Sequence, residues 1–263
     1  MVQNRAQKYN FPLETGAYTA INLDLIRRVE PKQELKRNFI MALQQPYVHQ
    51  EDGGPIYFES DFEAFVAEPF NMVSALIFVP IAIYWLVKNE RSDQTSNFMR
   101  FASVLLLIGG VGGTIYHGFR ISTLALFLDW TPILILCISA AAYFLHRIYN
   151  SNKVVLFSSA VIVLALLLNL AFTPIKHYNN IAYTLLGIYV LAPTFLILKK
   201  NHWKNWQFIF LALVSFGLAL FFRVYDRDGI LPIGTHFLWH VFGAFATHFM
   251  FFFVFRLGRR SQS

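Results

Sequence analysis

The sequence contains very little charge and almost no cysteine. Only 14% of its 263 residues are charged, and Cys137 is its single cysteine. One cysteine excludes an intrachain disulfide framework and a site built from several thiolates. Any metal site in this chain must therefore use histidine and carboxylate ligands.

Hydrophobic residues take the place of the missing charge. They make up 56% of the chain, and its 28 phenylalanines crowd into apolar runs. A hydrocarbon core about 30 Å thick needs roughly 20 apolar residues for each helical crossing. We predict seven crossings, at residues 69–87, 98–119, 123–144, 154–172, 180–198, 208–222 and 233–255. The pattern predicts an all-α, polytopic protein with seven transmembrane helices in contact with the lipid bilayer.

The first 68 residues contain no stretch that is long and apolar enough to span a membrane. The opening residues MVQNRAQKYN also lack the apolar core of a signal peptide. We therefore interpret residues 1–56 as an extramembrane N-terminal tail and residues 57–263 as one seven-helix membrane domain.

The basic residues predict the orientation in the membrane. Eleven lysines and arginines lie in the connectors after the first, third and fifth crossings and at the C-terminal end. The other connectors hold four, and residues 38–68 hold none. We expect the N-terminus outside and the C-terminus in the cytoplasm. The net charge of +7 is spread over these connectors without the basic and aromatic interleaving of a nucleic-acid groove, so no nucleic-acid partner is predicted. Protein partners are not indicated.

Polar residues begin the first predicted crossing, in the stretch AEPFNMVS. Glu68, Asn71 and Ser74 are spaced by three, which places them on one helix face. Ionisable groups inside a membrane are costly, so each one is a candidate functional residue.

Three other crossings place polar residues at the same depth, near the outer side. The second crossing ends at His117, and the third carries Asp129 about two turns in. The seventh begins with His236 and His240 in the stretch GTHFLWH. Two histidines at i and i+4 share a helix face, and a third from another helix leaves one zinc position open. The pattern predicts a catalytic Zn²⁺ site in which Asp129 acts as a base or orients a ligand.

Three further features have structural alternatives. Arg223 and Asp226 precede the histidine pair and form either a surface salt bridge or part of the site's closure. The acidic residues ahead of Glu68 are Glu51, Asp52, Glu59, Asp61 and Glu63, and we interpret them as a solvated tail rather than as a calcium loop. The glycines in GGVGG predict a close approach between helices.

Four stretches together resemble the alkaline ceramidases, especially their bacterial relatives. They are AEPFNMVSALIF, GGTIYHGF, LFLDWTPI and GTHFLWH, and the match covers about residues 57–256. Alkaline ceramidases belong to the CREST membrane-hydrolase superfamily, which also includes the progestin and adipoQ receptors and the Per1 lipid-remodelling proteins.

The resemblance implies a zinc-dependent seven-helix membrane hydrolase that cleaves the amide bond of a ceramide-like lipid. It implies His117, His236 and His240 as zinc ligands and Asp129 as the acid-base residue. It also places a Ca²⁺ site at the start of the first crossing, where Glu68 aligns, although that motif's tryptophan and asparagine have no clean match in GGPIYFESDF. Gly113 stands where eukaryotic members have serine, so Thr114 or Ser74 is the predicted oxyanion donor.

Other functions remain open at this point. A receptor or scaffold of the progestin and adipoQ type would use the metal only to tie helices together. A lipid-remodelling enzyme would cleave an ester, and a haem protein would use two histidines from different helices. A transporter is disfavoured because the sequence has no paired broken segments or inverted repeat.

Overall fold

The computed structural model describes residues 52–93, 95–173 and 175–258, and these contain helices without any strand. The elements are α4 (Pro69–Leu76), α5 (Phe78–Glu90), α6 (Asn97–Phe119), α7 (Thr123–Tyr149), α8 (Asn152–Phe172), α9 (Ile175–Lys200), α10 (Trp206–Val224), the short 3₁₀ helix η1 (Asp226–Asp228) and α11 (His236–Gly258). The predicted all-α class is confirmed.

Serine side chains fix the starts of three long helices. Ser96, Ser122 and Ser151 precede α6, α7 and α8, and each hydroxyl accepts a hydrogen bond from the backbone N–H three residues later. Each serine thus satisfies one of the backbone donors that a helix start leaves unpaired. These local signals mark where three of the helices begin.

The first predicted crossing consists of two helices rather than one. Helix α4 ends at Leu76 and α5 begins at Phe78. Pro80 has no backbone N–H, so the carbonyl of Leu76 loses its helical partner and the helix breaks there. The break leaves α4 as a short helix whose buried side includes Asn71 and Ser74.

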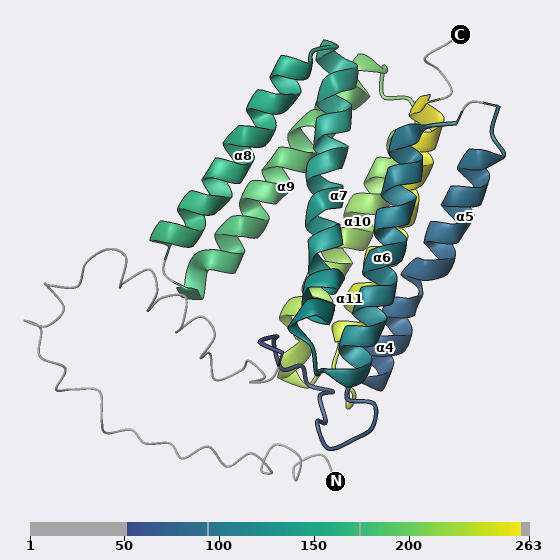
Figure 1. The fold of residues 1–263 in the computed structure, drawn as a ribbon. Helices are drawn as coiled ribbons and strands as arrows, with labels where there is room; N and C mark the ends of the chain where they lie inside the picture. Colours follow the sequence, from purple (N-terminus) through teal and green to yellow (C-terminus); the bar gives the residue numbers. More distant parts are fainter. Residues whose placement is uncertain (1–51, 94, 174, 259–263) are drawn as a thin grey trace, which may run out of the picture. The chain divides into compact units, whose positions relative to one another are not determined.

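Neighbouring helices pack in a sequence that brings distant parts of the chain together. Helices α8 and α9 lie against α7, α7 lies against α6, and α6 lies against both α4 and α5 (Figure 1). Helix α11 packs against α4 and α5 on one side and against α10 on the other. The ends of α6 and α10 and the starts of α4, α7 and α11 consequently meet at one end of the bundle, which we call the site end.

Glycines allow α6 and α7 to touch. A Cβ atom added at Gly112 would lie 2.5 Å from the Leu128 side chain and 2.7 Å from its backbone, and one at Gly109 would lie 3.2 Å from Pro132. All three distances are shorter than ordinary van der Waals contact. The predicted close helix approach is therefore confirmed, and it presses the Asp129 region of α7 against the histidine-bearing end of α6.

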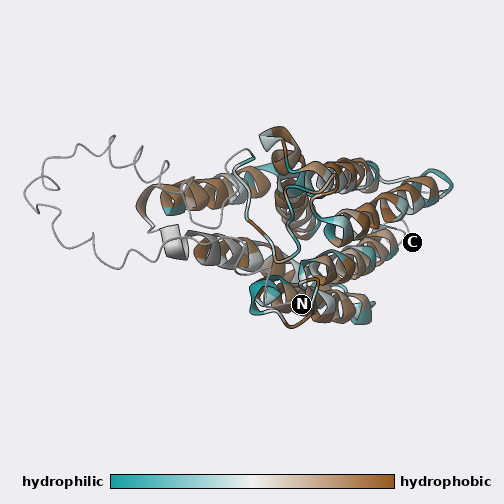
Figure 2. Ribbon diagram, turned by 90° about the horizontal axis from the view of Figure 1, so that it is seen from below, coloured by the Kyte–Doolittle hydropathy of each residue, from teal (hydrophilic) through white to brown (hydrophobic). Residues whose placement is uncertain are grey.

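The helices are suited to a lipid environment. Within the described residues, six segments are long and apolar enough to cross a membrane: Pro69–Glu90, Asn97–Phe119, Thr123–Tyr149, Asn152–Phe172, Trp206–Val224 and His236–Gly258. Helix α9, with 26 residues, corresponds to the predicted fifth crossing. Hydrophobic residues predominate around the helices (Figure 2), and many large ones are exposed, such as Phe157 at 73% and Phe172 at 80%. A multi-pass membrane protein in contact with lipid follows.

The predicted tail at residues 1–56 lies mostly outside the described residues, and the predicted orientation stays a prediction. The last five residues of this tail, 52–56, are described, and together with residues 57–67 they cover the site end. We call residues 52–67 the cap. The cap lies beside the starts of α4 and α11 and the end of α6, and it carries contacts that the sequence did not suggest.

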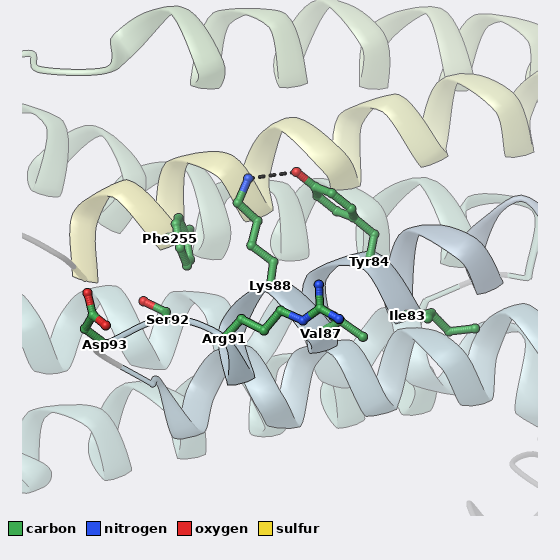
Figure 3. Close-up of a pocket in the computed structure, with 8 residues that line it drawn as sticks. All are labelled: Ile83, Tyr84, Val87, Lys88, Arg91, Ser92, Asp93 and Phe255. Atoms are coloured by element: carbon green, nitrogen blue, oxygen red, sulfur yellow. Dashed lines mark hydrogen bonds between the residues drawn. The ribbon is translucent and has the colours of Figure 1, made fainter.

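The bundle end opposite the site is packed with aromatic side chains. Trp85, Phe144 and Phe253 are almost completely buried there. A shallow pocket beside α5 and α11 is lined by Ile83, Tyr84, Val87, Lys88, Arg91, Ser92, Asp93 and Phe255 (Figure 3). The Lys88 ammonium group donates a hydrogen bond to the Tyr84 hydroxyl at 2.7 Å and faces four aromatic rings.

Candidate metal centre

Three histidines converge at the site end. His117 comes from the last turn of α6, and His236 and His240 come from the first two turns of α11. All three are buried, with at most 4% of each residue exposed. Their ring centroids are 4.8 to 5.4 Å apart. The structure thus brings together the three residues that the sequence identified.

The spacing of the imidazole nitrogens suits one metal ion. One ligand nitrogen from each histidine lies within 4.8 Å of the others. Zn–N bonds of 2.0–2.1 Å in a tetrahedral site would place these nitrogens about 3.3 Å apart, so binding would draw the rings together by roughly 1 Å. His117 Nε2 and His236 Nδ1 are buried without a hydrogen-bond partner among the described residues. Buried polar atoms are rarely left unpaired, and a metal would satisfy both.

Glu68 sets the tautomer of His117. Its carboxylate Oε2 lies 2.5 Å from His117 Nδ1, and both side chains are fully buried. A carboxylate can only accept, so His117 donates from Nδ1 and keeps the lone pair of Nε2 free for a metal. Burial alone would raise the pKa of Glu68, but the hydrogen bond from His117 and the charge of Arg120 outweigh burial and hold this pKa below its usual value.

Ser74 sets the tautomer of His240 by a similar chain. The Ser74 hydroxyl donates to the Asn71 carbonyl at 3.0 Å and lies 2.8 Å from His240 Nδ1. A hydroxyl has one proton, so Ser74 must accept a hydrogen bond from His240 Nδ1–H. The Nε2 lone pair of His240 is then available as a ligand. The side-chain amide of Asn71 also donates a hydrogen bond to Glu68 at 3.2 Å, which links the Glu68–His117 pair to the Ser74–His240 pair.

Asp226 fixes the start of the helix that carries the other two histidines. Its Oδ1 accepts hydrogen bonds from the backbone N–H groups of Thr235 at 2.7 Å and His236 at 2.8 Å, and its Oδ2 accepts from Phe58 of the cap at 3.0 Å. Gly234 has φ of +74°, and a Cβ there would lie 2.7 Å from Asp226 Oδ1. Asp226 therefore satisfies backbone N–H groups at the start of α11, and its bond to Phe58 helps to close the site.

Asp129 lies beside the histidine-bearing end of α6. A Cβ added at Gly113 would lie 2.5 Å from Asp129 Oδ1, so the carboxylate occupies the space that any side chain at position 113 would need. The carboxylate predicted as a base is thus present at the level of the three histidines.

A buried arginine completes the site end. Arg120 follows α6 with φ of 53°, in the left-handed region, and is 1% exposed. Its guanidinium pairs with Asp52 at 2.6 and 3.2 Å and donates to Glu68. Burial alone would lower the pKa of Arg120, but hydrogen bonding to Asp52 and the charge of Glu68 raise it, so the buried cation is fully charged. Breaking such a pair would cost about 3–5 kcal/mol.

Two acidic residues of the cap, Asp52 and Glu59, are not part of a solvated tail, as the sequence suggested, whereas Glu63 is exposed and Glu51 lies outside the described residues. Asp52 is completely buried against Arg120, and the Glu59 carboxylate accepts hydrogen bonds from the backbone N–H groups of Phe70 and Asn71. Glu59 thereby serves the start of α4, where unpaired N–H groups favour an anion. For Asp52 and Glu59 the prediction was wrong, because the Arg120 cation neutralises the first carboxylate and the start of α4 stabilises the second.

The remaining predicted residues have identifiable surroundings. The Thr114 hydroxyl donates to the Gly110 carbonyl at 2.7 Å, so its proton is already used within α6. Arg223 stacks its guanidinium over the Trp239 ring at 5.0 Å. Glu68 faces Arg120 and His117 rather than open solvent, so a guanidinium supplies positive charge where the resemblance implies Ca²⁺. Calcium binding stays a prediction.

Tyr57 and Arg120 are the main residues that sequence reasoning missed. The Tyr57 ring stacks on His236 with centroids 3.8 Å apart and lies 5.4 Å from the His117 ring. Burial raises the pKa of the Tyr57 phenol, which stays protonated. A signal for Arg120 did exist, because residues 38–68 carry several carboxylates without a cation, and few basic residues lie on that side of the predicted membrane.

Comparisons with known proteins give no family for the chain. No protein-family model matches it, and no curated protein matches it as a relative. The site is defined by its geometry: a buried set of three histidines that could hold a metal ion, in a helical protein whose segments are long and apolar enough to span a membrane.

Proposed function

We propose that the protein is a zinc-dependent membrane hydrolase that cleaves the amide bond of a ceramide-like lipid. The observation that carries the proposal is the arrangement of imidazole nitrogens. Glu68 and Ser74 each hold the Nδ1–H of one histidine, which leaves the Nε2 lone pairs of His117 and His240 available, and one ligand nitrogen from each of the three buried histidines lies within 4.8 Å of the others. A buried set of three neutral imidazoles is the donor set of many catalytic zinc sites.

The chemistry that zinc supplies in such a site is polarisation of a carbonyl and acidification of a bound water. The chain's own residues supply the rest. Asp129 accepts a proton from water during attack on the carbonyl carbon and returns it to the leaving amine, which balances the reaction. Glu68 keeps His117 in the ligand tautomer throughout, and Asp226 holds α11 in place.

The surroundings of the site favour a lipid substrate. The cap covers the site end through Tyr57 over His236 and through the Phe58 hydrogen bond to Asp226. Nearby helix surfaces expose large apolar residues, such as Val73 on α4 and Leu124 on α7. A substrate whose acyl chain enters from the bilayer would therefore reach the histidines beneath the cap.

The test is lipid hydrolysis by the purified protein with and without the proposed base. Asp129→Asn keeps the shape of the side chain but removes its basicity. We expect about one zinc per chain in both proteins by mass spectrometry and a loss of about 10²–10⁴-fold in fatty-acid release from a ceramide. Asp228→Asn, at an exposed position of η1, is the matched control and should leave the rate unchanged.

Two other outcomes would change the assignment. Cleavage of a matched ester lipid but not of ceramide would make the protein an ester-cleaving lipid-remodelling enzyme. A parent protein that retains zinc but releases no fatty acid from either lipid would contradict the hydrolase proposal and favour a receptor or scaffold with a structural metal.

A further inference from the structure

The cap residue Tyr57 contacts two of the three histidines from outside the helices. Its ring lies 3.8 Å from the His236 ring at an interplanar angle of 26°, and 5.4 Å from the His117 ring. Tyr57 is therefore part of the wall around the proposed metal position, although no helix carries it.

The position of Tyr57 is fixed on both sides along the chain. Its backbone N–H donates to the Ser60 hydroxyl at 3.0 Å, and the next N–H, of Phe58, donates to Asp226. The Arg120 guanidinium lies 5.8 Å from the Tyr57 ring. These bonds hold the backbone at Tyr57, and stacking on His236 holds its ring, so the side chain is preorganised for a substrate.

The hydroxyl of Tyr57 is available as a donor. Within the described part of the chain it has no hydrogen-bond partner, whereas the two hydroxyls that the sequence suggested are already used. Ser74 donates to the Asn71 carbonyl and Thr114 donates to the Gly110 carbonyl.

We propose that the Tyr57 hydroxyl donates a hydrogen bond to the carbonyl oxygen of the substrate as negative charge develops on that oxygen. This role rests on the proposed hydrolase function. A fixed donor aimed at a developing oxyanion in a water-poor site stabilises the transition state more than the ground state. The phenol keeps its proton, so no co-reactant is needed.

The experiment compares Tyr57→Phe with the parent in two measurements. Phenylalanine preserves the ring that stacks on His236 and removes only the hydroxyl. Tyr225→Phe, at a partly exposed tyrosine beyond α10, is the matched control. The first measurement titrates octanohydroxamate into cobalt-loaded protein and follows the visible absorption of Co²⁺. The second measures ceramide hydrolysis by the zinc-loaded protein.

We expect Tyr57→Phe to bind as much cobalt as the parent but to bind octanohydroxamate about 10-fold more weakly, because one hydrogen bond to an anionic oxygen is lost. We expect kcat for ceramide to fall about 10²-fold with little change in KM. Tyr225→Phe should match the parent in both measurements. Equal hydroxamate affinity in Tyr57→Phe and the parent would overturn the inference.

The two measurements separate this inference from the proposed function. Hydroxamate affinity that depends on the hydroxyl, in a parent that cleaves no ceramide, would keep Tyr57 as an oxyanion donor and refute the substrate assignment. A parent that takes up no cobalt would overturn both. Thermal unfolding of Tyr57→Phe at the parent's temperature checks that the cap has kept its fold.

Discussion

His240 and His248 lie on nearly the same face of α11, about 12 Å apart along its axis. The two residues have opposite hydrogen-bonding arrangements. His240 donates from Nδ1 to Ser74, so its Nε2 has a free lone pair. His248 Nδ1 accepts from Trp85 Nε1–H at 3.1 Å, and an indole can only donate. In neutral His248 the proton must therefore sit on Nε2.

The partner of a histidine, rather than its depth in the membrane, thus decides whether it can serve as a ligand. At the site end, Glu68 and Ser74 are acceptors and two further histidines face His240. At the opposite end, His248 is surrounded by the rings of Tyr84, Trp85 and Phe252. A histidine without a second ligand nearby and with its proton on Nε2 is a packing residue.

Removing a histidine from each end of the bundle should give the largest difference in zinc content. His236→Ala and His240→Ala each remove one of three ligands, and we expect bound zinc to fall from about one per chain to below about 0.1. His248→Ala removes a packing residue and should leave zinc content unchanged. Mass spectrometry of protein purified without chelators measures both. Zinc loss in His248→Ala, or zinc retention in the other two variants, would contradict the assignment of metal binding to the site end alone.

A methyl group at Gly113 should separate catalysis from metal binding. Its Cβ would lie 2.5 Å from Asp129 Oδ1, the end of a flexible side chain, so the carboxylate would move while the helices stay in place. We expect Gly113→Ala to keep its zinc and lose about 10²-fold in ceramide hydrolysis. Gly217→Ala, where a Cβ would meet nothing within 4 Å, is the control. An unchanged rate in Gly113→Ala would show that the position of Asp129 is not critical.

Neutralising Glu68 should weaken the metal site indirectly. Glu68→Gln removes the charge that holds His117 in its ligand tautomer and that pairs with Arg120. Loss of such a supporting carboxylate typically costs about 10–100-fold in metal affinity. Competition against a zinc-responsive dye measures the affinity. Glu90→Gln, in an exposed ion pair with Arg100, controls for general charge effects and should not change it. Parent-like affinity in Glu68→Gln would show that Glu68 acts only on stability.

The smallest effect should come from the opposite end. Trp85→Phe removes the indole N–H that His248 accepts while keeping an aromatic ring in the core. We expect the protein to lose about 1–3 kcal/mol in the free energy of unfolding, because a half-buried acceptor loses its donor and the core loses volume. Zinc affinity should stay at the parent value, as chemical denaturation and dye competition would establish.

The sequence predicted the histidine set because helix spacing and crossing direction fix depth. Once seven crossings were counted, His117, His236 and His240 had to lie near one end of the bundle. The cap could not be predicted in this way, because residues 52–67 follow no helical period and their contacts join positions far apart in the chain. The tautomers also depend on side-chain partners such as Asn71, whose carbonyl decides where the Ser74 proton goes.

The three hydrogen bonds of Asp226 join the cap to the start of α11, so water can enter the site there only when that helix start also opens. One carboxylate holds the amide of Phe58 in the cap and the amides of Thr235 and His236 at the start of α11. The cap cannot lift by itself without leaving this carboxylate short of a donor. Solvent deuterium should therefore reach all three amides through one shared opening event, with a common exchange rate. The same event would admit bulk water to the histidines, so the slowness of that exchange reports how dry the site is kept.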